Sequence, residues 1–270
     1  MANDLLKGKK GIIFGALNEN SIAWQVAERA HEEGAEFILT NAPIALRMGE
    51  LNELAQKTNS DIVPADVTSI EDLENLFNKA EEKFGKIDFI LHSIGMSINV
   101  RKKIHYTESN YEYYHKAMDI SAISFHKVMK VAKEKDIMNE WGSILALSFI
   151  AAQLSIPGYN DMSDAKSLLE SIARTFGYYY GIDKKVRINT ISQSPTKTTA
   201  GGGIKGFDSL YNYAELNSPL GNAPALDCAN YCIVMFSDLT KYVTMQNLFH
   251  DGGFSKTGVT DKMMEKLGFE

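Results

Sequence analysis

The stretch from Lys10 to Thr40, KGIIFGALNENSIAWQVAERAHEEGAEFILT, decides the fold of this chain. It opens with an apolar run, Lys10 to Gly15, that is rich in β-branched and aromatic residues, as buried strands are. From Ser21 the apolar residues recur every three to four positions, and Gly34 follows where a helix would end. Glu36 to Thr40 again has the composition of a buried strand. The stretch therefore predicts a strand, a helix and a second strand.

The same alternation continues along the chain. Further strands are expected at 61–66, 86–95, 142–147, 186–191 and 243–250, and helices at 69–80, within 110–132, at 161–180 and at 226–236. About seven strands alternating with helices predict an α/β fold, a Rossmann-like, doubly wound parallel sheet with helices on both faces. No internal repeat or linker interrupts the pattern, so residues 1–270 are expected to form a single domain.

One long stretch does not fit the alternation. Ser192 to Ser218 contains Thr196, Thr198 and a run of glycines, but little periodic apolar signal. It begins at the carboxyl end of a predicted strand, where doubly wound sheets bind ligands. Because long loops in compact domains are usually functional or disordered, we expect a mobile substrate lid here.

The composition excludes several classes of protein. With a net charge of −6 and no basic stripe, the chain is expected to bind neither nucleic acid nor a membrane surface. No stretch reaches the ~18–20 apolar residues of a membrane span, and the first ten residues lack the apolar core of a signal peptide. We therefore expect a soluble, cytoplasmic protein. Its two cysteines, Cys228 and Cys232, are too few for a disulfide scaffold and lack the histidines of a metal site, so we expect buried thiols and no metal.

The turn after the first strand reads Gly15-Ala-Leu-Asn-Glu-Asn-Ser21-Ile22, which departs from the G-x-G-x-x-G pattern of dinucleotide sites. Gly15 could still allow a tight exit from the strand. Ser21 at the helix N-cap could face a pyrophosphate, together with the free N–H groups of the first helical turn. The alternative is that Ser21 only caps the helix.

The ends of the next three strands bear on the choice of cofactor. The second ends at Thr40-Asn41-Ala42, which offers no cation for a 2′-phosphate, and the nearest basic side chain is Arg47. This favours NADH over NADPH. The third strand ends at Asp66, whose carboxylate could reach an adenine amino group. The fourth ends at Gly95, where the backbone could approach the cofactor closely.

Two tyrosines precede a lysine by seven residues, a spacing of about two helical turns that can place an acid/base pair on one face. Tyr159 lies just after the fifth strand and opens the next helix, so its hydroxyl and Lys166 can face the strand ends. Tyr178 and Lys185 fall at the far end of that helix, among other tyrosines. We therefore choose Tyr159 and Lys166 as the catalytic pair.

A doubly wound chain with this pair resembles the short-chain dehydrogenase/reductase superfamily, and it is similar in particular to the bacterial enoyl-acyl-carrier-protein reductases. The similar stretches follow one another in the right order over nearly the whole chain, at 15–22, 92–95, 119–121, 147–166, 189–198 and 251–254. The resemblance implies a dinucleotide-binding domain that reduces the trans-2 double bond of enoyl thioesters with NADH, in the last reductive step of fatty-acid elongation. It also implies a substrate carried on acyl-carrier protein and a homotetramer.

The resemblance further implies roles for individual residues. Lys166 would bind the nicotinamide ribose. Tyr159 would donate a hydrogen bond to the thioester carbonyl oxygen, where negative charge develops as hydride is transferred. The other cofactor-binding residues would be Gly15, Ser21, Ile22, Asp66, Val67, Ile94, Thr196 and Thr198. The acyl site would be lined by Ser97, Phe149, Tyr159, Met162 and Phe207.

Two positions depart from the family. Many members have a tyrosine ten residues before the catalytic one, where this chain has Phe149. Some enoyl reductases for long acyl chains share this phenylalanine, so activity is expected while the preferred chain length stays open. NADH-specific members often have glutamine where this chain has Ala42.

Alternatives to this function stay open. A ketoreductase of the same superfamily would have a serine thirteen residues before the tyrosine, but Ala146 stands there, and Ser143 and Ser148 are out of register. A catalytically silent nucleotide-binding protein is the second alternative, because a fold alone does not fix function. The tyrosine-rich segment 106–114 is expected to cover the edge of the acyl pocket or the helix beneath it, or else to bind a partner. The thiol of the substrate, acyl-carrier protein or coenzyme A, also stays open.

Overall fold

A single parallel sheet runs through the residues that the computed structural model describes, which are 3–47, 50–198 and 206–268. Its seven strands lie in the order β3-β2-β1-β4-β5-β6-β7, and every neighbouring pair is parallel. The strands are β1 (Lys10–Phe14), β2 (Glu36–Thr40), β3 (Asp61–Ile62), β4 (Ile87–His92), β5 (Met138–Ser148), β6 (Arg187–Gln193) and β7 (Asn247–His250). The strand order reverses between β1 and β4, the place at which doubly wound sheets bind ligands.

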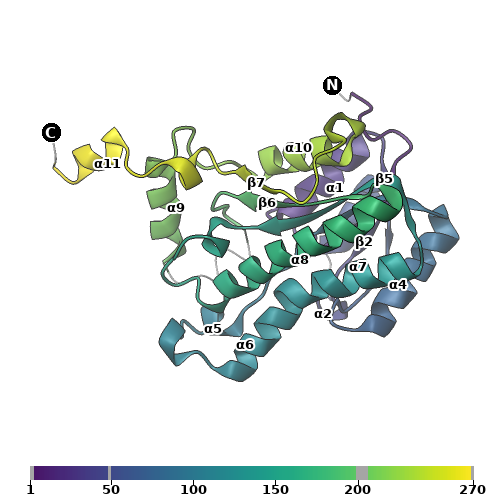
Figure 1. Cartoon of the computed structure of the whole chain (residues 1–270), viewed down its shortest axis with the longest axis horizontal. Helices are drawn as coiled ribbons and strands as arrows, with labels where there is room; N and C mark the ends of the chain where they lie inside the picture. Colours follow the sequence, from purple (N-terminus) through teal and green to yellow (C-terminus); the bar gives the residue numbers. More distant parts are fainter. Residues whose placement is uncertain (1–2, 48–49, 199–205, 269–270) are drawn as a thin grey trace.

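Helices cover both faces of this sheet, which confirms the predicted fold class (Figure 1). One face is covered by α1 (Ile22–Glu32), α3 (Glu50–Thr58) and α10 (Ala225–Phe236), and the other by α4 (Ile70–Phe84), α7 (Ser124–Glu134) and α8 (Asp161–Lys184). The other helices described are α2 (Pro43–Leu46), α5 (Ile98–Arg101), α6 (Tyr111–Met118), α9 (Phe207–Asn217) and α11 (Asp261–Lys266). Short 3-10 turns lie at Tyr106–Glu108, Ile150–Ala152, Asp238–Thr240 and Phe254–Lys256.

The two cores arise from the alternation of side chains along each strand. In β1, Ile12 and Phe14 pack beneath α4, α7 and α8, whereas Ile13 packs on the opposite face beneath α1 and α10. The second core also contains Cys228 and Cys232, both fully buried free thiols, as the sequence predicts.

Three predicted strands are too long. The strand expected at 86–95 ends at His92. The strand expected at 61–66 ends at Ile62, although the N–H groups of Val63 and Ala65 still donate to the carbonyls of Leu39 and Asn41. The strand expected from residue 243 begins only at Asn247, since Tyr242 and Met245 have φ of 71° and 61°, values that a strand does not adopt. The helices α2 and α3 lie between β2 and β3, where the sequence analysis expects no element.

The helix expected within 110–132 is two helices, α6 and α7, joined by a π-helical turn at Asp119–Ile123. Ser121 in this turn accepts a hydrogen bond from the backbone N–H of Met96 at 2.9 Å, and its hydroxyl donates to the Met96 carbonyl at 3.1 Å. The turn thereby fastens the segment after β4. Such π turns often lie beside functional sites.

The segment 192–218 is less irregular than the sequence predicts. It contains the end of β6 and the helix α9, so the expected loop is wrong for 207–217. Residues 199–205, which hold the run of glycines, lie outside the described residues. Figure 1 shows α9 beyond the sheet, at the end where the chain leaves β6.

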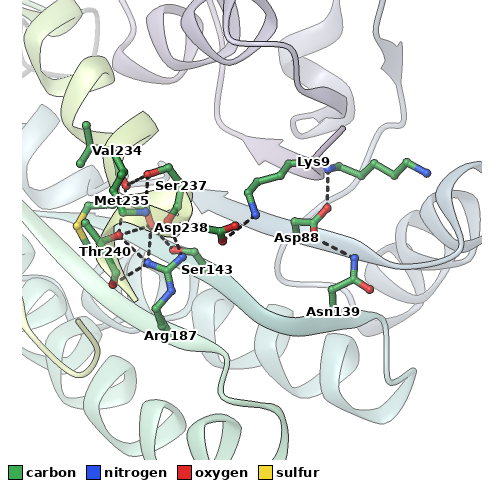
Figure 2. Close-up of polar contacts among 12 residues, drawn as sticks. Lys9, Asp88, Asn139, Ser143, Arg187, Val234, Met235, Ser237, Asp238 and Thr240 are labelled. Atoms are coloured by element: carbon green, nitrogen blue, oxygen red, sulfur yellow. Dashed lines mark hydrogen bonds and ion pairs between the residues drawn. The ribbon is translucent and has the colours of Figure 1, made fainter. Parts of the chain in front are cut away.

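A buried arginine at the amino end of β6 binds the carboxyl end of α10 (Figure 2). Arg187, at the start of β6, is 2% exposed and donates to the carbonyl oxygens of Met235 (3.0 Å), Ser237 (3.2 Å) and Thr240 (3.1 Å). Carbonyl groups at a helix C-terminus lack partners within the helix and favour a cation. Burial lowers the pKa of Arg187, and the charge of Asp238 opposes this effect.

Among the described helices, no helix is both long enough and apolar enough to span a membrane.

Candidate active site

A cavity of about 360 Å³ opens at the carboxyl ends of β1, β4, β5 and β6, beside α9. Nearly all of the predicted site residues line it, although they come from distant parts of the chain. Those residues are Gly15, Ser21, Ile22, Ile94, Ser97, Phe149, Tyr159, Met162, Lys166, Thr196, Thr198 and Phe207. The structure thus gathers the cofactor, catalytic and acyl positions around one space.

Asp66 and Val67 are the predicted residues that do not line this cavity. The exposed Asp66 carboxylate accepts hydrogen bonds from the backbone N–H and the hydroxyl of Thr68, at 2.9 and 2.7 Å. Val67 is buried in the core beside α4. Their adenine-binding role stays a prediction.

The turn at Gly15 requires glycine. Its φ is +92°, and a Cβ there would lie 2.0 Å from the carbonyl oxygen of Ser93 on the neighbouring segment. Glycine at this position therefore lets the exit from β1 pack closely against the segment after β4, at the wall of the cavity.

Ser21 has a different local role from the one expected. It occupies the N-cap of α1, but its side chain makes no capping bond to the helix. Instead its hydroxyl accepts from the N–H of Leu17 at 3.2 Å and donates to the carbonyl of Asn18 at 2.7 Å. The hydroxyl therefore braces the turn, and the first N–H groups of α1 have no serine cap.

The end of β2 is tied to the same turn. The side chain of Asn41 donates to the carbonyl oxygen of Ala16 at 2.8 Å and lines the cavity. Arg47, at the end of α2, is exposed and does not line the cavity.

Tyr159 and Lys166 both line the cavity, and α8 begins at Asp161, as the sequence analysis expects. Tyr159 precedes α8 by two residues, after Gly158 at φ +86°, and Asn160 at φ +49° follows it. The amide of Asn160 donates to the carbonyl of Ile104 at 2.7 Å, which supports a conformation unusual for a residue other than glycine. Both side chains therefore line one cavity although Tyr159 lies in a strained turn before α8 and Lys166 lies within that helix.

Burial controls the electrostatics of this pair. Tyr159 is 9% exposed and Lys166 is 6% exposed. Burial raises the pKa of Tyr159 and lowers the pKa of Lys166 to about 8, against the opposing charge of Glu170. Lys166 Nζ donates to the carbonyl oxygen of Leu147 at 2.7 Å. His92 at the end of β4 is fully buried, and burial together with the charge of Lys166 lowers its pKa to about 3.

The acyl side of the cavity is apolar. The rings of Phe149 and Tyr159 lie 5.0 Å apart, and both belong to a small cluster with Met162, Val100 and Ala214 of α9. Packing of α9 on this cluster brings Phe207 to the rim of the cavity.

Ser97 leads to a residue that the sequence analysis missed. Its hydroxyl donates to Oδ1 of Asp161 at 2.5 Å, and the amide of Asn99 donates to Oδ2 at 2.8 Å. Asp161 is fully buried at the start of α8. An acidic residue two places after the tyrosine was the available signal, but only the fold shows that it is buried against Ser97.

Other lining residues were not singled out from the sequence. Gln193, Ser194 and Pro195 lie in the stretch 189–198 that resembles the family, whereas Met96, Arg101 and Leu210 lie outside every similar stretch. They are ordinary residue types whose position in the cavity follows from strand register and from the path of α9.

The rival tyrosine–lysine pair lies elsewhere. Tyr178 is 56% exposed near the end of α8, and Lys185 follows that helix and pairs with Glu140 at 3.3 Å. The hydroxyls of Tyr106 and Tyr114 both donate to Asp164 in the first turn of α8, at 3.1 and 3.0 Å. This part of the tyrosine-rich segment therefore covers the helix, one of the positions expected for it.

Several known proteins similar to this chain in sequence and fold are enoyl reductases. A family model described as Enoyl-(Acyl carrier protein) reductase matches residues 15–255. Enoyl-[acyl-carrier-protein] reductase [NADH] 2 of Rhizobium meliloti is 33% identical, over 95% of this chain and 95% of its own.

Solved structures similar to this chain include enoyl reductases. The FabI–NADH complex of Alistipes finegoldii is 63% identical, with a TM-score of 0.96 over 97% of this chain and 93% of its own. The Bacillus cereus enoyl-acyl carrier protein reductase, solved with NADP⁺ and an indole naphthyridinone, is 30% identical, with a TM-score of 0.89 over 96% of this chain and all of its own. Sequence and fold together show that this chain belongs to the enoyl-(acyl carrier protein) reductase family.

Proposed function

We propose that this protein reduces the trans-2 double bond of an enoyl thioester carried on acyl-carrier protein, with NADH as the reductant. The observation that carries the proposal is the convergence of Tyr159 and Lys166 on the cavity that also receives the glycine turn after β1. Membership of the enoyl reductase family supports it.

The residues around the cavity fit NADH. The tight turn at Gly15 and the N-terminus of α1 would suit the pyrophosphate. A Cβ at Gly95 would stand 3.2 Å from Met162 Cε and 3.8 Å from Lys166 Nζ, so the Gly95 backbone lies beside the ammonium. Thr196 and Thr198 line the same cavity, where we expect the nicotinamide. When bound, NADH supplies the hydride that adds to the β-carbon of the substrate.

Tyr159 acts on the thioester carbonyl. As hydride reaches the β-carbon, negative charge develops on the carbonyl oxygen, and the phenol hydroxyl donates a hydrogen bond to it. Because burial raises the pKa of Tyr159, the hydroxyl stays protonated at neutral pH and available as a donor. The enolate then takes a proton from solvent water at the α-carbon, which gives the saturated thioester and leaves the Tyr159 hydroxyl protonated.

Lys166 orients the reactants. Its ammonium would hold the nicotinamide ribose hydroxyls, and the hydrogen bond to the Leu147 carbonyl fixes it at the end of β5. Because its pKa is about 8, the charge is present at neutral pH and is lost in mildly alkaline solution.

The substrate class has a direct test. Ala146 stands at the ketoreductase serine position and is fully buried, so a ketone would lack that donor. We expect the purified protein to oxidise NADH with crotonyl or longer trans-2-enoyl thioesters, and scarcely with 3-ketoacyl thioesters. Faster turnover of the ketoacyl substrate would favour the ketoreductase alternative, and no turnover of either would favour a silent nucleotide-binding protein. Comparison of carrier-protein with coenzyme A thioesters decides the preferred thiol.

The lid over 192–218 is retained as part of the proposal. Its described part includes Phe207 at the cavity rim and α9 on the apolar cluster beside Tyr159. Slower hydrogen exchange in α9 after NADH is added would support closure over the ligand, and unchanged exchange would contradict it.

We also propose a homotetramer. Tyr178, Tyr179 and Ile182 near the end of α8 are 56%, 52% and 64% exposed, a cluster of large apolar side chains that a second copy of the chain could cover. Light scattering gives the assembly mass, and a monomer in solution would contradict the proposal.

A further inference from the structure

Glu170 is a buried carboxylate that the reaction described above does not use. It lies on α8 one helical turn beyond Lys166 and is 5% exposed. Its Oε1 accepts a hydrogen bond from the Ser148 hydroxyl at 2.7 Å, and its Oε2 accepts one from the Gln153 side chain at 3.2 Å. Both donors are neutral. A carboxylate buried among neutral donors costs free energy, and its charge acts strongly on nearby groups because little water screens it.

The side chains of Glu170 and Lys166 hydrogen-bond to consecutive residues of β5. Lys166 donates to the carbonyl of Leu147, and Glu170 accepts from the side chain of Ser148. The next residue is Phe149, whose ring lies against Tyr159. Two successive turns of α8 therefore hold the end of the strand that leads into the acyl site.

Three titratable groups face Lys166 from the surrounding elements. His92 comes from β4, and burial lowers its pKa to about 3, so it is neutral at pH 7. Tyr159 comes from the turn before α8, and burial raises its pKa, so it too is neutral. Glu170 lies on α8 itself, and its charge opposes the effect of burial on Lys166.

We propose that Glu170 is a positioning residue of this active site, whose carboxylate keeps the Lys166 ammonium charged while fixing the end of β5 against α8. The inference rests on the proposed function, because it assigns Glu170 a part in the work of Lys166. A merely structural carboxylate would anchor Ser148 and Gln153 without any effect on the charge of Lys166.

Glu170→Gln separates these two roles. Glutamine keeps the side-chain length and an oxygen that can accept from Ser148, and it removes the charge. Its NH2 group replaces Oε2, so the Gln153 amide must turn its oxygen toward residue 170, and the Gln153→Ala variant controls for that contact. Without the negative charge, the protonated form of Lys166 is less stable. We therefore expect its titration midpoint to fall by roughly 0.5–1 pH unit.

The midpoint can be measured without substrate or cofactor. Lysine is labelled with ¹³C in the ligand-free protein, the Lys166 signal is assigned by its loss in Lys166→Arg, and its shift is followed against pH. Gln153→Ala removes a contact of Glu170 but leaves the charge, so it should keep the wild-type midpoint. Glu170→Asp retains a carboxylate, so its Lys166 midpoint should lie close to that of the wild type. Glu134→Gln removes an exposed negative charge on α7 and controls for the change in net charge.

Enzyme kinetics complete the test. In Glu170→Gln the alkaline fall of kcat/KM should move to lower pH together with the NMR midpoint, whereas Gln153→Ala should not move it. An unchanged Lys166 midpoint in Glu170→Gln, or an equal shift in Gln153→Ala, would overturn the proposal. So would a shifted midpoint with an unmoved kinetic profile. Because the titration needs no turnover, absence of enoyl reduction would refute the proposed function while leaving the charge effect of Glu170 measurable.

Discussion

The ring of Phe149 lies 5.0 Å from the ring of Tyr159, between centroids, with the two planes inclined by 50°. Phe149 is 8% exposed and stands where many relatives have a second tyrosine, so a hydrocarbon edge replaces a hydroxyl beside the proposed hydrogen-bond donor. The tilted packing fixes the orientation of Tyr159 through apolar contact.

This contact predicts that Phe149→Tyr is tolerated. The added hydroxyl would lie beside a cavity that already contains polar groups, so we expect the protein to fold and to retain turnover with enoyl thioesters. Steady-state kinetics over a series of acyl lengths measures the effect, and a change should appear in chain-length preference. Complete loss of activity with an unaltered melting temperature would contradict this prediction.

Substitutions of the two catalytic candidates should change different kinetic parameters. Tyr159→Phe removes a donor to charge that exists only during hydride transfer, so we expect kcat to fall roughly 10–1000-fold with NADH affinity nearly unchanged. Lys166→Ala removes the ribose contact, so the KM for NADH should rise steeply. Fluorescence titration of NADH and steady-state rates separate the two effects.

Tyr178→Phe is the matched control for this pair, because Tyr178 is exposed near the far end of α8. It should leave both parameters unchanged. Loss of kcat in Tyr178→Phe with normal turnover in Tyr159→Phe would show that the other tyrosine–lysine pair is catalytic.

Cofactor preference follows from the end of β2. Asn41 uses its amide to hold the Ala16 carbonyl, and Arg47 lies outside the cavity. A 2′-phosphate would lose water there without gaining a cation, at a cost of at least ~1–3 kcal/mol. We expect kcat/KM for NADH to exceed that for NADPH by about tenfold or more. Equal values would mean that Arg47 or another cation reaches the phosphate.

Acid should destabilise the fold through His92. Its pKa is lowered to about 3 by burial, whereas the unfolded chain takes up this proton near pH 6.5. The unfolded state therefore binds more protons between these values, and stability falls as the pH falls. The contribution is about 2 kcal/mol between pH 7 and pH 5. Urea unfolding of wild type and His92→Gln across this range measures it, and parallel curves for the two proteins would contradict the prediction.

Arg187 should matter for stability and little for the reaction. Arg187→Met removes a hydrogen bond from three carbonyl oxygens at the end of α10. The carbonyls of Met235 and Thr240 keep donors in the Ser143 hydroxyl and the Val243 N–H, whereas the Ser237 carbonyl loses its donor, at a cost of about 1–3 kcal/mol. We expect a clear drop in the free energy of unfolding, measured by urea denaturation. Lys9→Met is a milder control, because Lys9 pairs with Asp238 at a partly exposed position (Figure 2). An equal loss in the two variants would show that the buried hydrogen bonds of Arg187 add little.

Much of the fold could be predicted because it rests on local pattern. The run Lys10 to Gly15 and the strand Glu36–Thr40 are apolar at the positions that the structure buries, apart from Thr40, and the helices on both faces follow from the alternation of strands with helices. Sequence patterns were less accurate at strand ends. Tyr242 and Met245 have positive φ, and β7 begins only after them.

The sequence by itself determined which residues could do the chemistry. Tyr159, Lys166 and Gly15 were recognisable from their spacing and from their place after strands, because parallel strands bring their carboxyl ends to one edge. Only the tertiary structure decided how these residues are held. In the structure the Ser21 hydroxyl bonds to the Asn18 carbonyl in its own turn, and Tyr159 is followed by Asn160 with a positive φ. Asp161 and Glu170 are buried near the site. Those features depend on contacts between residues far apart in the chain and on exclusion of water, neither of which a local pattern encodes.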